Sequence, residues 1–164
     1  MKTLLLLRHA KAKDGSPGLP DFDRTLNDRG RNEAQAIGNF LRSQDVPPSL
    51  ALSSSAKRAR ETTELVLESA GLTVEVRYDE RIYEAGPTQL LEVVAQIEDE
   101  HNAVLLVGHN PGMEELLQLL TNRFEQMATC TLAKLDLAGD KWADVLSEKG
   151  RVDWIVRPKD LTVD

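Results

Sequence analysis

Two short, uninterrupted apolar runs constrain the fold of this chain most strongly. They are Leu4–Leu7, close to the start, and Ala103–Val107, in the second half. Neither run alternates with polar residues, a pattern typical of strands that are buried on both faces of a parallel sheet. Parallel strands are joined by crossover connections, which are usually helices. The two runs therefore predict an α/β fold in which helices cover both faces of the sheet.

Helical patterns alternate with short apolar runs along the rest of the chain. Asn27 is a suitable cap for one helix, and Ser55 is a candidate N-cap for a second helix that ends before Gly71. Residues 11–26 are rich in Gly, Pro and Asp and predict a loop. The sequence predicts helices over about 28–43 and 56–69 and from Pro87 and Pro111, and strands over 3–8, 50–52, 73–77, 103–107, 131–137 and 151–157. We expect a three-layer α/β/α sandwich with a mostly parallel central sheet, and a single domain over residues 1–164.

Composition excludes several classes of partner and compartment. A net charge of −7 argues against nonspecific binding to nucleic acid. The first apolar run is too short for a signal peptide or a membrane span, so we expect no membrane association. One cysteine, Cys130, cannot form an internal disulfide, which favours a cytoplasmic location and a buried structural thiol. Lys and Arg are concentrated in residues 1–60, whereas the remainder is strongly acidic, a distribution that fits an anionic substrate.

Each of the two apolar runs ends at a histidine. His9 follows Arg8 after the first run, and His109 follows Gly108 after the second. Ligands of open α/β sheets bind beyond the carboxyl ends of the strands, so both imidazoles are expected at one edge, joined by Arg8 and Arg58. Two imidazoles and two guanidiniums in one crevice are typical of phosphoryl transfer. The alternative, that each histidine is a hydrogen-bonded structural residue, is the commoner role for a lone histidine at a strand end.

Four segments carry a resemblance to a known family. They are Arg8-His9-Ala10-Lys11, Asp21 to Gly30, Ser54 to Thr62, and Gly108-His109-Asn110-Pro111. Together they resemble the histidine phosphatase superfamily, also called phosphoglycerate mutase-like, and within it the small phosphohistidine phosphatase branch. The resemblance spans roughly residues 3–158. Ala10 stands where the family signature Arg-His-Gly has glycine, a replacement often seen in that small branch.

The resemblance implies a role for each of the four central residues. His9 would be the nucleophile that carries the phosphoryl group covalently. Arg8 and Arg58 would bind its equatorial oxygens, because planar guanidinium groups match phosphate and stabilise its charge. His109 would donate a hydrogen bond to the phosphate. The register of the motif favours Arg58 over Arg60 as the ligand.

Two further residues have open roles. In the phosphohistidine branch the arginine of an Arg-x-Leu element reaches the phosphate, which makes Arg24 a candidate, although a solvated loop arginine is the alternative. Larger family members place a carboxylic acid before the second histidine motif. Glu84 lies in that region, either as a general acid or as a solvated loop residue.

The function that follows is dephosphorylation without a metal or cofactor. Asp21, Asp23 and Asp28 lack the ordered spacing of a calcium loop, and the third histidine, His101, lies in a hydrophilic stretch. The leading hypothesis is a phosphohistidine phosphatase that acts on a phosphorylated protein. The alternatives are a phosphatase or mutase acting on a small phosphate ester, and a non-catalytic phosphate-binding module.

Overall fold

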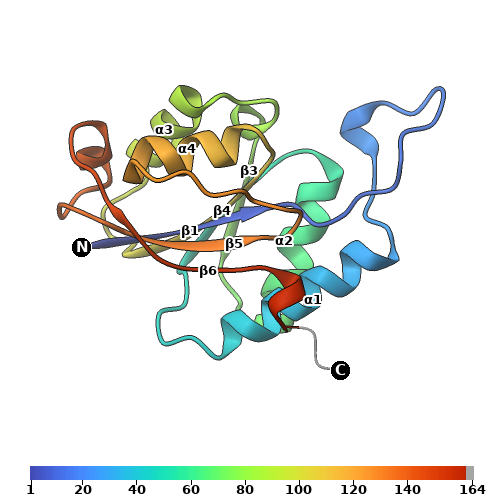
Figure 1. Ribbon diagram of the computed structural model, residues 1–164, viewed down its shortest axis with the longest axis horizontal. Helices are drawn as coiled ribbons and strands as arrows, with labels where there is room; N and C mark the ends of the chain where they lie inside the picture. The colour runs from blue at the N-terminus through green and yellow to red at the C-terminus, as the bar shows by residue number, and fades with distance from the viewer. Residues whose placement is uncertain (162–164) are drawn as a thin grey trace.

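A six-stranded sheet lies between two layers of helices in the computed structural model, which describes residues 1–161 (Figure 1). The strand order is β3-β2-β4-β1-β5-β6. Helices α3 and α4 cover one face of the sheet, and α1 and α2 cover the other. The strands are β1 (Lys2–Arg8), β2 (Leu50–Ser54), β3 (Glu75–Asp79), β4 (Ala103–Gly108), β5 (Leu132–Leu137) and β6 (Arg151–Val156), and the helices are α1 (Asp28–Arg42), α2 (Lys57–Ala70), α3 (Pro87–Ala95) and α4 (Gly112–Thr121).

Only one strand runs against the others. β1, β2, β3 and β4 are mutually parallel, β5 is antiparallel to β1, and β6 is antiparallel to β5 and so returns to the direction of β1. The predicted fold class, a three-layer α/β/α sandwich with a mostly parallel sheet, is therefore confirmed. The carboxyl ends of β1, β2 and β4 meet at one edge, which we call the catalytic edge. β5 begins at this edge and β6 ends there.

The apolar run of β1 is continuous because helices cover both of its faces. Leu4 and Leu6 belong to the core beneath α3 and α4, while Leu5 and Leu7 belong to the core against α1 and α2. All four side chains are completely buried. Removing such a side chain from water contributes roughly 1.5–3 kcal/mol, so β1 is held in place from both sides.

Three local features explain or correct the sequence predictions. Asn27 caps α1 as predicted, its side chain accepting the Gly30 N–H at 2.8 Å. Ser55 was expected to cap α2, which is wrong: Ala56 is the N-cap, and it makes no side-chain cap bond. Ser54 Oγ instead accepts the Ala56 N–H at 3.1 Å, just before the helix begins. Strand β3 lies two residues later than predicted, because its pairing with β2 aligns Leu50 with Glu75.

The connections between these elements differ in length, and several contain single 3₁₀ turns. Residues 141–146, whose structure the sequence left open, contain a 3₁₀ helix at Trp142–Leu146. The segment between β1 and α1 extends beyond the catalytic edge (Figure 1) and contains a 3₁₀ turn at Asp21–Asp23. No helix within residues 1–161 is both long enough and apolar enough to span a membrane.

Replacing Leu6 with alanine tests the role of β1. Leu6 is completely buried at the centre of the sheet, so Leu6→Ala is expected to lower the free energy of unfolding by about 2–5 kcal/mol. The measurement is urea unfolding followed by circular dichroism. Leu119 of α4 is 36% exposed, so Leu119→Ala is the matched control and should change stability little. Equal losses for the two variants would contradict this description of the core.

Candidate active site

His9 occupies the position directly beyond β1. Its backbone N–H donates to the Gly108 carbonyl at 3.0 Å, which extends the β1–β4 pairing past the end of the strand. The side chain is only 7% exposed. Ala10 is also buried, and its N–H donates to Thr62 Oγ1 at 3.0 Å. The alanine that replaces the signature glycine therefore fits without exposing or crowding the histidine.

The contacts of His9 define which ring nitrogen carries the proton. Nδ1 lies 2.8 Å from the Ala10 carbonyl oxygen, which can only accept, so Nδ1 is the protonated nitrogen. Nε2 lies 3.4 Å from Nε of Arg58, a permanent donor, and so presents its lone pair. Burial, helped by the nearby His109, Arg58 and Arg8, lowers the pKa of His9 to about 3. His9 is therefore a neutral imidazole with an unprotonated Nε2 at physiological pH.

His109 faces His9 from the end of the neighbouring strand β4. The two ring centroids are 5.0 Å apart. Nε2 of His109 lies 2.7 Å from Ser54 Oγ, which already accepts the Ala56 N–H and so can donate its own hydrogen to Nε2. That arrangement leaves the proton of the neutral ring on Nδ1, a buried atom without a hydrogen-bond partner among residues 1–161. Burial and the charge of Arg58 lower the pKa of His109 to about 4, so this ring is also neutral.

Arg58 enters the site from the first turn of α2. Its side chain is almost fully buried, and Nε points to His9 as described above. Nη1 donates to the Asp21 carbonyl at 2.8 Å, and Nη2 donates to Asp21 Oδ2 at 3.0 Å. Arg60 lies elsewhere, stacked at 4.1 Å over the ring of Tyr78. Of the two arginines, the structure thus brings Arg58 to His9.

Asp21 is a site residue that the sequence analysis did not identify as such. Besides the bonds from Arg58, its Oδ2 accepts the Tyr83 hydroxyl at 2.7 Å, and its Oδ1 forms an ion pair with Arg24 Nε at 3.2 Å. The Tyr83 hydrogen bond, with the charges of Arg58 and Arg24, lowers the pKa of Asp21. An internal carboxylate therefore holds the guanidinium group that is expected to bind phosphate. Asp21 and Arg58 are distant in sequence, and no spacing pattern signals such a contact.

Tyr83 completes the wall of the site opposite His9. Its ring packs edge-on against His109 at 5.5 Å, and Arg58 lies 6.0 Å from its centroid. Burial and the bond to Asp21 raise the pKa of the Tyr83 hydroxyl to about 12, with a smaller contribution from Glu84. The hydroxyl is therefore a hydrogen-bond donor and not an anion. The sequence analysis missed Tyr83, and its position next to Glu84 was the only signal.

Arg8 lies on the other side of His9, towards β5. Its Nη1 donates to the Met127 carbonyl at 3.0 Å, and Asn110 Nδ2 donates to the same oxygen at 2.8 Å. Nε of Arg8 is buried without a partner among the described residues. Burial lowers the pKa of Arg8, and its positive charge contributes to the lowered pKa of both His9 and His109. Arg8 is thus close to both imidazoles, although neither touches it.

The two residues whose roles were open lie at the periphery. Arg24 contacts Asp21 and the Lys13 carbonyl, and its charge makes a small contribution to the lowered pKa of His109. Glu84 is exposed, with a positive φ of 56°, and it approaches the site through Tyr83. The structure therefore brings Arg8, His9, Arg58 and His109 together. Arg24 is linked to this group through Asp21, and Glu84 is linked to it through Tyr83.

Residues 1–161 offer little for a metal ion. Glu98, Glu100 and His101 form the one group of potential ligands found there, and they precede β4, at the end of the sheet away from His9. Both Nη atoms of Arg77 already donate to Glu98, at 2.8 and 2.6 Å.

Cys130 is completely buried, and this burial raises the pKa of its thiol, so it is not a nucleophile.

Fold and site together define a class of protein: α/β phosphatases with two histidines and two arginines at the carboxyl edge of a mostly parallel sheet. The family model of the histidine phosphatase superfamily (branch 1) matches residues 4–89. An uncharacterized Mycobacterium tuberculosis protein is 34% identical over 150 residues, which cover 85% of this chain and 91% of that protein. The chain therefore belongs to the histidine phosphatase superfamily.

Solved structures place the chain in the small SixA-like branch of that superfamily. A protein from Agrobacterium tumefaciens, assigned as the phosphohistidine phosphatase SixA, is 32% identical with a TM-score of 0.82, covering 96% of this chain and 98% of that one. A protein from Nakamurella multipartitia with the same assignment is 28% identical with a TM-score of 0.84, covering 96% of both chains. These relatives match nearly the whole length of the chain.

The contact between Asp21 and Arg58 leads to a prediction about anion binding. In Asp21→Asn the carboxylate that competes for Arg58 is removed, so orthophosphate is expected to bind about tenfold more tightly, equivalent to about 1.4 kcal/mol. Isothermal titration with orthophosphate measures this directly. Asp23→Asn, an exposed residue of the same 3₁₀ turn, is the control and should bind as the unmodified protein does. Weaker binding by Asp21→Asn would mean that Asp21 holds Arg58 in its productive position.

Proposed function

We propose that this protein is a phosphohistidine phosphatase that removes a phosphoryl group from a phosphorylated protein through a covalent intermediate on His9. The observation that carries the proposal is the protonation pattern of His9. Its Nδ1–H is committed to the Ala10 carbonyl, and its Nε2 is unprotonated, buried, and adjacent to Arg58. A neutral imidazole in this state is a nucleophile that needs no separate base to activate it.

In the first step, the Nε2 lone pair forms a bond to phosphorus while the bond from phosphorus to the leaving nitrogen of the substrate breaks. Arg8, Arg58 and the Nδ1–H of His109 supply donors for the three equatorial oxygens. Phosphorylation makes the His9 ring cationic, and the Nδ1–H bond to Ala10 stabilises that charge. In the second step, water attacks phosphorus, the bond to Nε2 breaks, and orthophosphate and neutral His9 are formed.

The same site favours a phosphoimidazole over a phosphate ester. A phosphoimidazole protonated on its ring leaves as neutral imidazole, so it needs no strong acid from the enzyme. Between Glu84 and His109 the chain forms only α3, β4 and short connections, with no inserted segment that could cover a small metabolite. The absence of such an insertion favours a side chain on the surface of another protein, because a small ligand gains most of its binding energy from enclosure.

The observation that favours the alternative, a small-molecule phosphomonoesterase, is the place of Glu84 beside Tyr83 at the margin of the site. An alkoxide is a poor leaving group and would require a carboxylic acid at such a position.

The unpaired, buried Cys130 fits a reducing compartment, and we propose the cytoplasm.

The deciding experiment compares a histidine-phosphorylated protein with aryl and sugar phosphates as substrates. We expect a higher kcat/KM on the phosphohistidine protein and little change in Glu84→Gln, together with radiolabel trapped on His9 after a rapid quench at neutral to alkaline pH. His9→Ala should be inactive. A sugar phosphate preferred about tenfold or more, with loss of that activity in Glu84→Gln, would establish the phosphomonoesterase instead. A folded protein that turns over none of these substrates would be a binding module.

Arg58 and Arg60 provide a matched pair of variants. Arg58→Ala removes a donor beside the transferred phosphoryl group and should lower kcat/KM by about 10²–10³, the loss typical of one donor to a developing anion. Arg60→Ala removes only the stacking on Tyr78 and should stay within about threefold of the unmodified enzyme, since such an exposed contact contributes little. Similar losses in the two variants, measured as initial rates on one substrate, would contradict the assignment of Arg58.

Metal independence is a further part of the proposal. Arginine and imidazole groups occupy the role that Mg²⁺ has in many phosphoryl-transfer enzymes, namely neutralising the charge of the transferred group. Dialysis against EDTA and a second chelator is therefore expected to leave the rate unchanged. Loss of activity that one added divalent cation restores would refute this part.

A further inference from the structure

A cavity of about 370 Å³ opens beside His9 on the catalytic edge, on the side of β5 and β6. It lies between the first turns of α1, the segment that precedes β5, and the residues that follow β6. Arg8, which precedes His9, and Asn110, which follows His109, both contribute to its wall. The cavity is therefore lined by the sequence neighbours of both histidines, and none of Arg58, Asp21 and Tyr83 contributes to its wall.

Basic side chains dominate the cavity. Arg8, Arg29, Arg157 and Lys159 line it, and within residues 1–161 the side chain of Arg157 donates only to a neutral acceptor, the Gln126 carbonyl. Lys159 has no polar partner within residues 1–161, and the Arg29 side chain is 73% exposed. These cations are therefore available to an incoming anion.

The two acidic residues of the cavity are already used by the fold. Glu114 Oε2 accepts the Met127 N–H at 2.7 Å. Glu33 Oε1 accepts the Lys11 N–H at 3.2 Å and the Thr129 hydroxyl at 3.3 Å, and its other oxygen lies 3.5 Å from Arg29. Both carboxylates keep their negative charge, but four basic side chains face these two acidic ones, so the balance of charge at the cavity remains positive.

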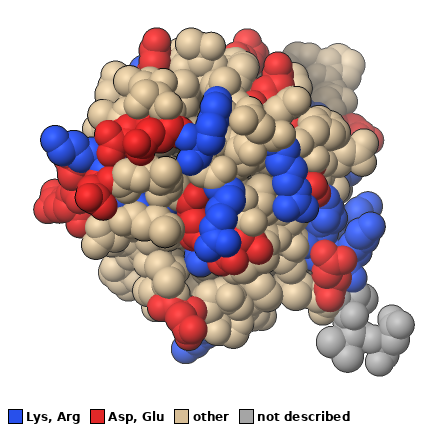
Figure 2. All heavy atoms as spheres, turned by 60° about the vertical axis from the view of Figure 1, so that its left-hand side comes forward, with Lys and Arg blue, Asp and Glu red and all other residues tan. Residues whose placement is uncertain are grey.

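The inner wall carries two buried polar atoms that the described residues leave unpaired. They are Arg8 Nε and Asn110 Oδ1. Buried polar atoms are nearly always hydrogen-bonded in native proteins, so a wall with an unused donor and an unused acceptor suits a polar occupant. The excess of basic side chains at the cavity differs from the charge pattern on another part of the surface. Acidic and basic side chains are interspersed over much of the face shown in Figure 2, which brings the left-hand side of Figure 1 forward.

We propose that this cavity binds an acidic side chain that flanks the phosphohistidine of the protein substrate. The inference rests on the proposed function and extends it to substrate selection. Adjacent residues of an extended peptide are about 3.3 Å apart along the chain, and the Cα atoms of Arg8 and His9 are about 3.8 Å apart. A carboxylate one or two residues from the phosphohistidine can therefore reach the cavity while the phosphoryl group lies against His9.

Two synthetic peptides test the proposal. Both carry one phosphohistidine, which is flanked by glutamates in the first and by glutamines in the second. The unmodified enzyme is expected to prefer the acidic peptide about fivefold or more in kcat/KM, chiefly through KM, the scale set by one or two exposed ion pairs. The preference should shrink as salt is raised, because exposed charges are screened.

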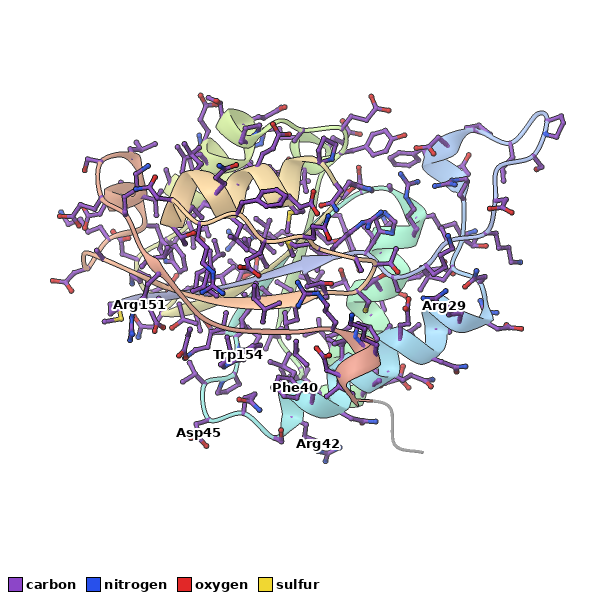
Figure 3. All side chains as sticks on the ribbon, in the orientation of Figure 1. Arg29, Phe40, Arg42, Asp45, Arg151 and Trp154 are labelled. Atoms are coloured by element: carbon purple, nitrogen blue, oxygen red, sulfur yellow. The ribbon has the colours of Figure 1, made fainter. Side chains whose placement is uncertain are left out.

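Variants of the cavity rim connect the preference to its residues. The double variant Arg29→Gln with Lys159→Gln should treat both peptides nearly alike, whereas its hydrolysis of a phosphate ester whose aryl group carries no charge should be unchanged. Arg42→Gln is the matched control, because Arg42 lies on the same helix as Arg29 but at its opposite end (Figure 3). That variant should retain the full preference.

Equal rates for the two peptides with the unmodified enzyme, or a preference that persists in the double variant, would overturn the inference and leave the proposed function intact. Unphosphorylated forms of the peptides, used as inhibitors of aryl phosphate hydrolysis, separate the two failures. Stronger inhibition by the acidic peptide that disappears in the double variant, without turnover of either phosphopeptide, would support the cavity and refute the phosphohistidine substrate.

Discussion

The pairing of β1 with β4 is the constraint on which the site depends. Its register places Arg8 opposite Gly108, and one further bond, from the His9 N–H to the Gly108 carbonyl, carries the alignment past the strand ends. The two histidines that follow these strands therefore lie side by side, with ring centroids 5.0 Å apart. Burial on both faces holds this pair of strands from both sides, so the geometry of the two rings comes from the core and not from the loops.

Electrostatics at the catalytic edge follow from the same burial. Low solvent exposure disfavours the charged form of an imidazole, and the neighbouring guanidiniums act in the same direction, so His9 and His109 are neutral. Arginine has too high a pKa to lose its proton, so the arginines keep their charge. A site built in this way combines an unprotonated, nucleophilic nitrogen with permanent cations, a pairing that water-exposed histidines could not maintain below neutral pH.

Sequence patterns could predict the parts of this structure that depend on local chemistry. Continuous apolar runs predicted the buried strands and hence the shared edge of His9 and His109, and Asn27 predicted the start of α1. Contacts between distant loops carried no such signal, which is why Asp21 and Tyr83 were missed as partners of Arg58. β3 was misplaced by two residues because its bounds are set by pairing with β2. The N-cap of α2 was misassigned because Ser54, and not Ser55, supplies the hydroxyl.

One carbonyl supports both halves of the site. The oxygen of Met127 accepts bonds from Arg8 and from Asn110, the neighbours in sequence of His9 and His109. It can do so because β5 runs against the other strands and thus begins at the catalytic edge. The donors bind a backbone oxygen, which every residue has, whereas the buried Met127 side chain contributes to the core. An insertion or deletion between α4 and β5 would displace this oxygen from both residues at once. The length of this connection therefore constrains the site more strictly than its composition does.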